Sequence, residues 1–218
     1  MFDLLVRMLA AYLLGSVNGA LLIGRFRGVD IRTQGSGNAG GTNALRTQGW
    51  AFAAGVIVID VAKAVIAVRW MPTAVFAPTL SVEWLAVACG FAAVIGHVYP
   101  IFHGFRGGKG VATVLGTLLA LSLPLLLGLL AVWFVMMFVF GFVGLGSMVA
   151  AAALPLLAQL AGARGVITPE EVLPLTVFGA VCAIFVIWTH RTNIARMRAG
   201  TEPRARSLWL VGRLIGRS

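Results

Sequence analysis

The sequence predicts an all-α polytopic membrane protein with seven transmembrane helices. Of its 218 residues, 60% are hydrophobic and only 11% are charged, whereas soluble domains carry roughly a quarter charged residues. The apolar residues form segments of about 20, the length that a helix needs to cross the hydrocarbon core. No polar stretch is long enough to build a core of its own, so we expect a single domain over residues 1–218, with 191–218 as a basic cytoplasmic tail.

The apolar segments predict most of the helices directly. The expected helices are 2–24, 50–70, 84–101, Val111 to about 125–129, and 172–190. The remaining apolar region, 130–161, is too long for one crossing at ~1.5 Å of rise per residue. Its glycines and Ser147 can break a helix. This region therefore predicts two short crossings that are joined by a turn near Ser147.

The distribution of the net charge of +10 predicts the orientation. Lysines and arginines cluster in the gaps after the first and third helices and at the C-terminus, where seven arginines follow residue 190. Loops rich in Lys and Arg stay in the cytoplasm, so we expect the N-terminus outside and both basic gaps and the tail inside. A single crossing over 130–161 would place the arginine-rich tail outside. A nucleic-acid partner is not expected, because no soluble basic domain carries the charge.

Both ends of the chain need an interpretation. The first 24 residues are interpreted as an uncleaved helix, because the positive charge follows the apolar run instead of preceding it. The tail leaves two alternatives open. An amphipathic helix on the membrane surface is one of them, since apolar residues stand among the arginines, and a disordered basic tail is the other. The apolar residues are Leu208, Trp209, Leu210, Leu214 and Ile215.

A glycine-rich segment, GSGNAGGTNALR over 35–46, lies in the first basic gap. It contains G-x-G-x-x-G, but a dinucleotide fingerprint needs a βαβ unit, and here the neighbours are apolar helices. Glycines still let backbone N–H groups converge on an anion, and Arg46 can hold a phosphate bidentately. The alternative is a plain connecting loop. The candidate phosphate-binding residues are Ser36, Gly37, Asn38, Gly40, Thr42, Asn43 and Arg46.

A second segment, FRGGKGVAT over 105–113, lies in the next basic gap. It is not a P-loop, because Gly110 follows Lys109 where Ser or Thr is needed. Lys109 begins the fourth predicted helix, whose N-terminus favours an anion, so Gly107, Gly108 and Lys109 are candidate phosphate ligands. The alternative is that Lys109 reaches lipid headgroups as a topology signal. Together the two segments predict a protein that handles a phosphorylated substrate at a membrane surface.

The C-terminal end of the last helix carries a further candidate pair. His190 ends this helix, and Asn193 follows one turn later on the same face. His190 can orient or deprotonate a substrate hydroxyl, and an interfacial histidine without a role is the alternative. His97 and His103 are expected to be structural. No grouping of histidines and cysteines suggests a metal site.

Two charged residues lie inside the 50–70 helix. Asp60 and Lys63 stand at i, i+3, and intramembrane charges of this kind can pair with each other. We expect a structural ion pair that supports the cytoplasmic site, and a proton or ion path is the alternative. Cys89 and Cys182 lie in apolar runs and are expected to be free thiols.

Three motifs resemble, in this order, the bacterial membrane acyl-phosphate:glycerol-3-phosphate acyltransferases, the PlsY family. They are GSGNAGGTNALR (35–46), HVYPIFHGFRGGKGVAT (97–113) and HRTNIARMRAGTE (190–202). The chain length, the helix pattern and the basic tail fit this family across nearly the whole chain. Gly41 stands where an alanine is common in the family, and Arg106 where a lysine is common.

The resemblance implies a seven-helix enzyme of the bacterial inner membrane with a site that faces the cytoplasm. It would transfer a fatty acyl group from acyl phosphate to the sn-1 hydroxyl of glycerol 3-phosphate, the first acylation of phospholipid biosynthesis. The products would be lysophosphatidic acid and phosphate, and no cofactor or metal is needed. By motif position, Ser36, Lys109, His190 and Asn193 are implied as catalytic, with Ser147 near the site. The implied partners are both substrates and the bilayer, and the tail has a second candidate partner, the soluble enzyme that makes acyl phosphate.

The residues fit this chemistry. Acyl phosphate is a mixed anhydride with a good leaving group, so the expected task is to bring two anionic phosphates together. Arg46, Lys109 and backbone amides would offset their repulsion. No G-x-S-x-G elbow is evident, so we expect direct attack by the hydroxyl, with His190 or a phosphate oxygen taking the proton.

The competing function class is an organophosphate transporter. It would share the basic glycine-rich segments and the pair of Asp60 and Lys63. Transporters often contain inverted repeats, and none is found in the sequence.

Overall fold

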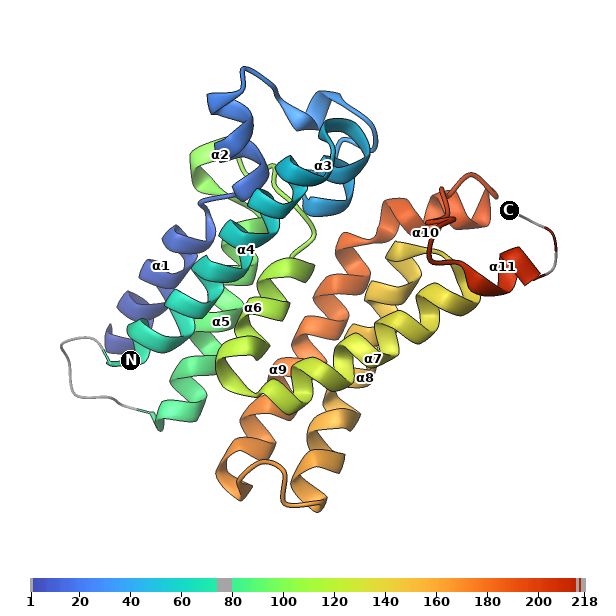
Figure 1. The fold of residues 1–218 in the computed structure, drawn as a ribbon. Helices are drawn as coiled ribbons and strands as arrows, with labels where there is room; N and C mark the ends of the chain where they lie inside the picture. The colour runs from blue at the N-terminus through green and yellow to red at the C-terminus, as the bar shows by residue number, and fades with distance from the viewer. Residues whose placement is uncertain (1, 74–79, 215, 217–218) are drawn as a thin grey trace. The chain divides into compact units, whose positions relative to one another are not determined.

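The computed structural model describes residues 2–73, 80–214 and 216, and these residues form helices joined by turns (Figure 1). The chain divides into two compact units, Met1–Leu121 and Ser122–Ser218. A single domain over 1–218 stays a prediction.

The first unit is a group of helices packed along α4. Its helices are α1 (Phe2–Gly15), α2 (Gly19–Phe26), α3 (Gly41–Gln48), α4 (Trp50–Trp70), α5 (Val82–Val98) and α6 (Val111–Leu121), with 3-10 turns at Ile31–Thr33 (η1), Met71–Thr73 (η2) and Ile101–His103 (η3). α1, α5 and α6 all pack against α4, and α2 and α3 contact it as well. One apolar cluster joins α2, α3 and the N-terminal half of α4, and it includes Ala20, Ala44, Phe52 and Val56.

Small residues allow the helices of this unit to approach closely, as is common between membrane helices. A Cβ atom on Gly15 of α1 would overlap the backbone of Ala93 in α5. In the same contact, a Cβ atom on Gly96 of α5 would overlap the backbone of Tyr12 in α1. The two glycines therefore fix the spacing of α1 and α5.

The second unit contains three long helices and the tail. They are α7 (Leu123–Phe140), α8 (Val143–Ala163) and α9 (Pro169–Thr189), followed by α10 (Arg191–Arg198) and α11 (Leu210–Leu214). α8 packs against both α7 and α9. The tail returns to the end of α7, where Trp209 is buried and its indole N–H donates to the carbonyl of Val139 at 3.0 Å. Ile215, one of the predicted apolar tail residues, lies outside the described residues.

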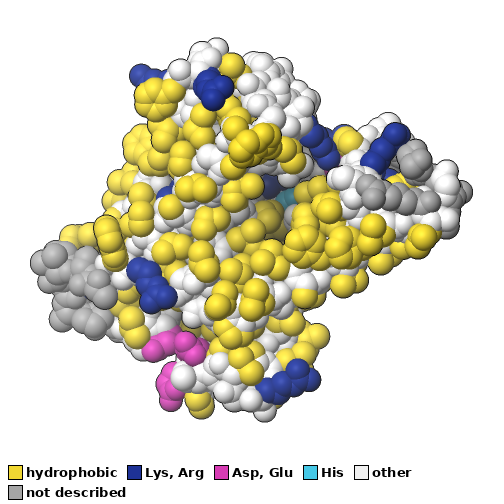
Figure 2. Space-filling view, in the orientation of Figure 1, with side chains coloured by type: hydrophobic (Ala, Val, Ile, Leu, Met, Phe, Trp, Pro, Cys, Tyr) yellow, Lys and Arg dark blue, Asp and Glu magenta, His cyan; other side chains and the backbone are white. Residues whose placement is uncertain are grey.

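The helices support a multi-pass membrane protein. Among the described residues, five helices are long and apolar enough to cross a membrane, and the pair α1–α2, bent by 43°, adds a sixth candidate. α6, with 11 residues, is shorter. Hydrophobic side chains cover most of the visible surface of each unit (Figure 2). Seven crossings and the orientation of the termini stay predictions.

Three of the predicted helices agree with the structure, and two boundaries are wrong. The helices expected at 50–70, 84–101 and 172–190 are α4, α5 and α9. The first helix was expected to be continuous over 2–24, but it breaks because Asn18 caps a new helix, its side chain accepting from the N–H of Leu21. The fourth helix was expected to reach 125–129, but it ends at Leu121, and α7 begins with a proline in its first turn.

The turn that was expected near Ser147 is also wrong. α7 ends at Phe140, and Gly141 follows in the left-handed region with φ 74°. Glycine enters this region without a steric penalty, so it is the residue that stops the helix. Ser147 lies inside α8, where its hydroxyl donates to the carbonyl of Val143 at 2.9 Å. Two long helices therefore meet at Gly141, six residues earlier than expected.

Candidate active site

The first glycine-rich loop is folded around the side chain of Asn43, which is only 2% exposed. Its Oδ1 accepts from the backbone N–H of Ser36 at 2.9 Å. Its Nδ2 donates to the carbonyls of Ile31 at 3.2 Å and Gln34 at 3.0 Å. Because the amide is saturated by backbone groups, Asn43 holds the loop in shape from the inside. Direct contact between Asn43 and a phosphate stays a prediction.

The outer side of this loop presents donors to solvent. Ser36, Thr42 and Arg46 are exposed, and Asn38 and Gly40 are half-buried. α3 starts directly after Gly40 without a side-chain cap, so the N–H groups of its first turn are open to an anion. Among the residues that the structure describes, the Arg46 side chain has no hydrogen bond or ion pair. Gly37, with φ 71°, provides a left-handed turn within the loop.

The second glycine-rich loop folds back onto the end of α5. The backbone N–H groups of Gly107 and Gly108 donate to the carbonyls of Val98 at 3.1 Å and His97 at 3.2 Å. A Cβ atom on Gly108 would overlap Nε2 of His97 and lie 2.8 Å from the carbonyl oxygen of Ala39 in the first loop. The two loops therefore meet at Gly108, where only glycine fits.

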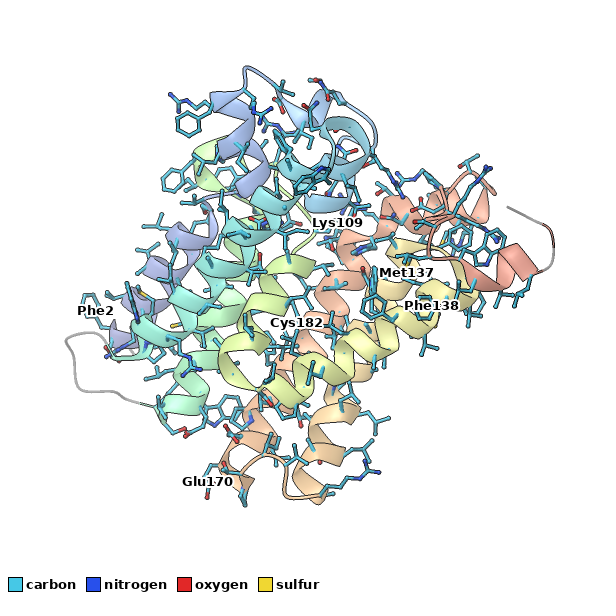
Figure 3. All side chains as sticks on the ribbon, in the orientation of Figure 1. Phe2, Lys109, Met137, Phe138, Glu170 and Cys182 are labelled. Atoms are coloured by element: carbon cyan, nitrogen blue, oxygen red, sulfur yellow. The ribbon has the colours of Figure 1, made fainter. Side chains whose placement is uncertain are left out.

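Lys109 follows this contact and is half-buried. Figure 3 labels it where the second loop enters α6. This is the position that the sequence predicted, one residue after the glycine pair and at the start of a helix. An ammonium group there adds a charge to the backbone donors of the same loop.

A further link joins the first basic gap to the second. The Arg32 side chain donates to the carbonyls of His103 at 3.0 Å and Arg106 at 3.4 Å, and it pairs with Asp30 at 2.8 Å. The side-chain hydrogen bond from Arg32 is the main reason why the pKa of Asp30 lies below its ordinary value. The sequence analysis did not single out this pair, whose i, i+2 spacing was its only signal.

A buried polar cluster lies beneath the loops. Nζ of Lys63 is 2.9 Å from Oδ1 of Asp60 and 3.0 Å from Nδ1 of His97. Nδ1 of His97 is in turn 3.2 Å from Oδ1 of Asp60. The predicted ion pair of Asp60 and Lys63 is therefore present, and His97, which was expected to be structural, completes it.

The second unit places the third motif at the junction of α9 and α10. His190 is 4% exposed, and its Nδ1 lies 2.8 Å from the carbonyl oxygen of Val186. A carbonyl oxygen only accepts hydrogen bonds, so Nδ1 carries a proton, and Nε2 is the acceptor nitrogen when the ring is neutral. The ring is thus held in the tautomer that a general base requires.

Asn193 is braced by an acidic residue that the sequence analysis missed. Its Nδ2 donates to Oε1 of Glu202 at 2.6 Å, and Nε of Arg196 donates to Oε2 of the same carboxylate at 2.6 Å. Asn193 and Glu202 are both 7% exposed. The available signal was that Glu202 is the only acidic residue in the 191–218 tail.

Ser147 lies close to this group within the second unit. A Cβ atom on Gly144 would lie 2.8 Å from Nδ2 of Asn193, so this turn of α8 packs directly on the asparagine. Ser147 stands one turn later on the same face of α8, and it is 5% exposed.

The predicted site residues thus fall into two groups, one in each unit. The first unit holds Ser36, Gly37, Asn38, Gly40, Thr42, Asn43, Arg46, Gly107, Gly108 and Lys109, and the second holds Ser147, His190 and Asn193. Among the described residues, no three His, Cys, Asp or Glu side chains are grouped so that they could hold a metal ion.

Known proteins resemble the chain over almost its full length. A family model described as glycerol-3-phosphate acyltransferase matches residues 5–200. The glycerol-3-phosphate acyltransferase of Gloeobacter violaceus is 41% identical over 196 residues, which cover 89% of this chain and 91% of the relative. That of Chlorobium chlorochromatii is 36% identical, and the match covers 94% of this chain and 97% of the relative.

Two solved structures share the fold. Both are crystal structures of PlsY (YgiH), an integral membrane glycerol 3-phosphate acyltransferase. The glycerol 3-phosphate form is 33% identical with a TM-score of 0.76, and the match covers 92% of this chain and 94% of that chain. The lysophosphatidic acid form is 32% identical with a TM-score of 0.74 and the same coverage.

Proposed function

We propose that this chain, which belongs to the glycerol-3-phosphate acyltransferase family, transfers a fatty acyl group from acyl phosphate to the sn-1 hydroxyl of glycerol 3-phosphate. The family model and the relatives make it an acyltransferase of the membrane, and the resemblance that three motifs predicted is confirmed. The observation that carries the proposed substrates is the pair of PlsY structures, one in a glycerol 3-phosphate form and one in a lysophosphatidic acid form. These are the acceptor and the product of the proposed reaction.

The two glycine-rich loops support the choice of two phosphorylated substrates. Each loop leads into a helix, whose first turn offers backbone N–H groups, and each carries a candidate cation, Arg46 in the first and Lys109 in the second. Two dianionic phosphates repel each other strongly at short distance. Fixed donors that are already oriented offset this repulsion without reorganisation. We therefore assign the ten site residues of the first unit to the phosphate site, with Ser36, Arg46 and Lys109 among its ligands. Asn43, Gly107 and Gly108 shape the loops, because their polar groups are bonded to the protein backbone.

The second unit supplies groups suited to a hydroxyl. Nε2 of His190 is the acceptor nitrogen of its ring, because Nδ1 donates to Val186. Nδ2 of Asn193 donates to Glu202, so the amide oxygen is the end of this side chain that can accept from a hydroxyl. Ser147 lies on α8 one turn after Gly144, which packs on Asn193, and it is assigned to the same group.

The proposed reaction is a direct transfer. The sn-1 hydroxyl oxygen attacks the carbonyl carbon of acyl phosphate, and the bond between that carbon and the bridging oxygen breaks. Phosphate leaves with the electron pair, and the hydroxyl proton passes to His190 or to a phosphate oxygen, so the products are lysophosphatidic acid and hydrogen phosphate. No acyl-enzyme is required, and labelled donor should leave no stable acyl group on Ser36.

The reaction is tested by phosphate release in detergent. Purified protein should release phosphate only when acyl phosphate and glycerol 3-phosphate are both present, and the product should carry its acyl group at sn-1. Acyl-CoA in place of acyl phosphate should give no transfer. Uptake of glycerol 3-phosphate into sealed vesicles without product formation would instead support an organophosphate transporter.

For the membrane topology we propose seven crossings, with the N-terminus outside and the tail and the site in the cytoplasm of a bacterial inner membrane. The crossings are α1–α2, α4, α5, α6, α7, α8 and α9. Eleven residues make α6 about 17 Å long, so it is the shortest of them. Support comes from Trp209, which packs at Gly141 and bonds to Val139, so the tail and the α7–α8 turn share one side.

Single cysteines test this topology. A membrane-impermeant thiol reagent added to intact cells should label a cysteine at Arg164, between α8 and α9, and should not label one at Arg204 in the tail. The native Cys89 and Cys182 are buried and give little background. Labelling at Arg204 alone would reverse the orientation.

A further inference from the structure

We propose that His97 is a positioning residue for the phosphate site. In this inference, Asp60 and Lys63 lock the His97 ring in place, and the locked ring holds Gly108 and therefore Lys109 in their positions. The inference rests on the proposed function, because it assigns a phosphate to the loop that His97 supports. The sequence predicted a structural ion pair that supports the cytoplasmic site, and it did not connect this pair with His97.

The locked state of the ring follows from its surroundings. Asp60 and Lys63 come from α4 and His97 comes from α5, and the three residues are at most 2% exposed. Nδ1 of His97 lies within 3.2 Å of both charged partners. If the ring rotated, Nδ1 would leave both Asp60 and Lys63. Two buried charges would then have fewer contacts, which costs free energy in a medium of low polarity.

The charged pair is itself held by backbone groups of the segment between α1 and α2. The N–H of Gly19 donates to Oδ1 of Asp60 at 3.0 Å. Nζ of Lys63 donates to the carbonyl of Val17 at 2.8 Å. These bonds tie the break in the first helix to the cluster. They also explain how opposite charges persist inside a membrane helix, since each charge has several partners.

The opposite edge of the locked ring faces the second loop. A Cβ atom on Gly108 would overlap Nε2 of His97 and lie 2.9 Å from its Cε1. The backbone adds to this contact, because the N–H of Gly108 donates to the carbonyl of His97 at 3.2 Å. Gly108 thus rests on His97 through both the ring and the main chain, and the next residue is Lys109.

The first loop touches the same point. The Cβ position of Gly108 lies 2.8 Å from the carbonyl oxygen of Ala39, and that carbonyl also accepts from Nδ2 of Asn18 at 3.2 Å. Asn18 is fully buried and directly precedes Gly19, whose N–H bonds to Asp60. The cluster therefore supports both loops, by the His97 ring on one side and by Asn18 on the other. A change in the ring should alter phosphate affinity without any direct contact between His97 and the phosphate.

The experiment is a double-mutant cycle between His97 and Gly108, read as the affinity for glycerol 3-phosphate and as kcat and KM. Gly108→Ala introduces a methyl group that overlaps the ring, so we expect at least a tenfold loss of affinity in the folded protein. His97→Ala removes the ring and should weaken binding to a similar extent. The double variant should bind better than Gly108→Ala alone, because the methyl group enters the space that the ring has left.

The rescue is expected to be partial, since Ala39 still limits the space at Gly108. Gly128→Ala is the matched control, because its new methyl group would lie 3.4 Å from the nearest atom, an ordinary contact. If the His97→Ala variant does not fold, His97→Asn is used in its place. The asparagine amide can still contact Asp60 and Lys63, but the side chain is too short to reach the space at Gly108 that the ring edge fills. With this variant the same rescue of Gly108→Ala is expected.

Two results would overturn the inference. One is that the losses at His97 and Gly108 simply multiply in the double variant, which would show that the two residues act independently. The other is a folded His97 variant with wild-type affinity and KM. Binding is measured without turnover, so the two proposals fail separately: a wild-type protein that binds glycerol 3-phosphate but transfers no acyl group refutes the proposed function alone.

Discussion

Replacing Glu202 by glutamine should impair catalysis while leaving the protein folded. The carboxylate is 2% exposed and accepts two short hydrogen bonds, both 2.6 Å long, from Asn193 and Arg196. The Glu202→Gln change keeps the shape but turns one acceptor oxygen into an NH2 donor. That donor must face either the amide of Asn193 or the guanidinium of Arg196, both of which are donors themselves.

The size of the loss in kcat depends on which of the two side chains, Asn193 or Arg196, moves away from the new NH2 group. The Arg196 side chain is 30% exposed and can turn to water, whereas Asn193 is 7% exposed. When the new donor faces Arg196, that side chain turns to water and Asn193 donates only to a neutral carbonyl oxygen. When the new donor faces Asn193, the amide flips, and its NH2 takes the place of the oxygen that we propose accepts from the substrate hydroxyl. Loss of the charge on the Asn193 bond, or of the partner of one buried polar group, costs about 1–3 kcal/mol, which corresponds to roughly 5- to 150-fold in rate. We expect this loss in kcat.

Initial rates of phosphate release give kcat, and intrinsic tryptophan fluorescence gives Tm. Glu170→Gln is the matched control, because Glu170 is exposed at the start of α9, and its rates should not change. In the double variant Asn193→Asp and Glu202→Gln, the new amide at 202 donates to the new carboxylate at 193, so an amide–carboxylate bond is restored with donor and acceptor exchanged. We expect Tm to recover while kcat stays low. The reasoning is refuted if Glu202→Gln keeps kcat within about twofold of wild type, or if its activity falls only in proportion to the unfolded fraction.

Three further predictions concern cations. Lys109→Ala should abolish turnover in a folded protein. Arg106→Ala, which alters an exposed side chain in the same loop, should keep most of the turnover. Retained activity in Lys109→Ala would remove Lys109 from the site. Arg46→Lys should raise the KM for glycerol 3-phosphate about tenfold, because an ammonium cannot grip phosphate as a fork, and an unchanged KM would argue against phosphate contact. Arg7→Ala should lower the free energy of unfolding by about 3–5 kcal/mol, since Arg7 is 2% exposed and pairs with Asp3 at 2.8 Å. A thermal melt checks this loss of stability. A loss of kcat in the folded fraction would contradict a purely structural role for Arg7.

The sequence predicted the helices whose boundaries depend on hydrophobic length alone. α4 has the expected bounds, because the 50–70 run is apolar apart from Asp60, Lys63 and Arg69 and has a glycine before it. The break between α1 and α2 was missed because Asn18 and Gly19 carry it through contacts with residues far along the chain, among them Asp60. The turn at Gly141 was missed because several glycines stand close together there, and the sequence does not reveal which one has a positive φ.

In the candidate site, too, some residues follow from a local sequence pattern and others depend on contacts between distant parts of the chain. Ser36, Arg46 and Lys109 could be proposed as site residues because basic and glycine-rich loops in an apolar chain require a partner. The supporting residues could not. His97 lies 34 residues from Lys63 in the chain, and Glu202 lies nine residues from Asn193 across a turn. Their roles arise from tertiary contacts, for which no local pattern exists.

Buried side-chain amides recur wherever the candidate site must keep its shape. Asn43 satisfies three backbone groups inside the first loop, Asn18 ties that loop to α2, and Asn193 is oriented by Glu202. An amide provides a donor and an acceptor on a short, uncharged side chain, so it can fix a loop without adding charge beside a phosphate. The arginines and Lys109 are then left to supply the charge. Separate groups for shape and for charge let the donors be oriented before the substrates arrive, and such preorganisation would lower the barrier to the proposed acyl transfer between two anions.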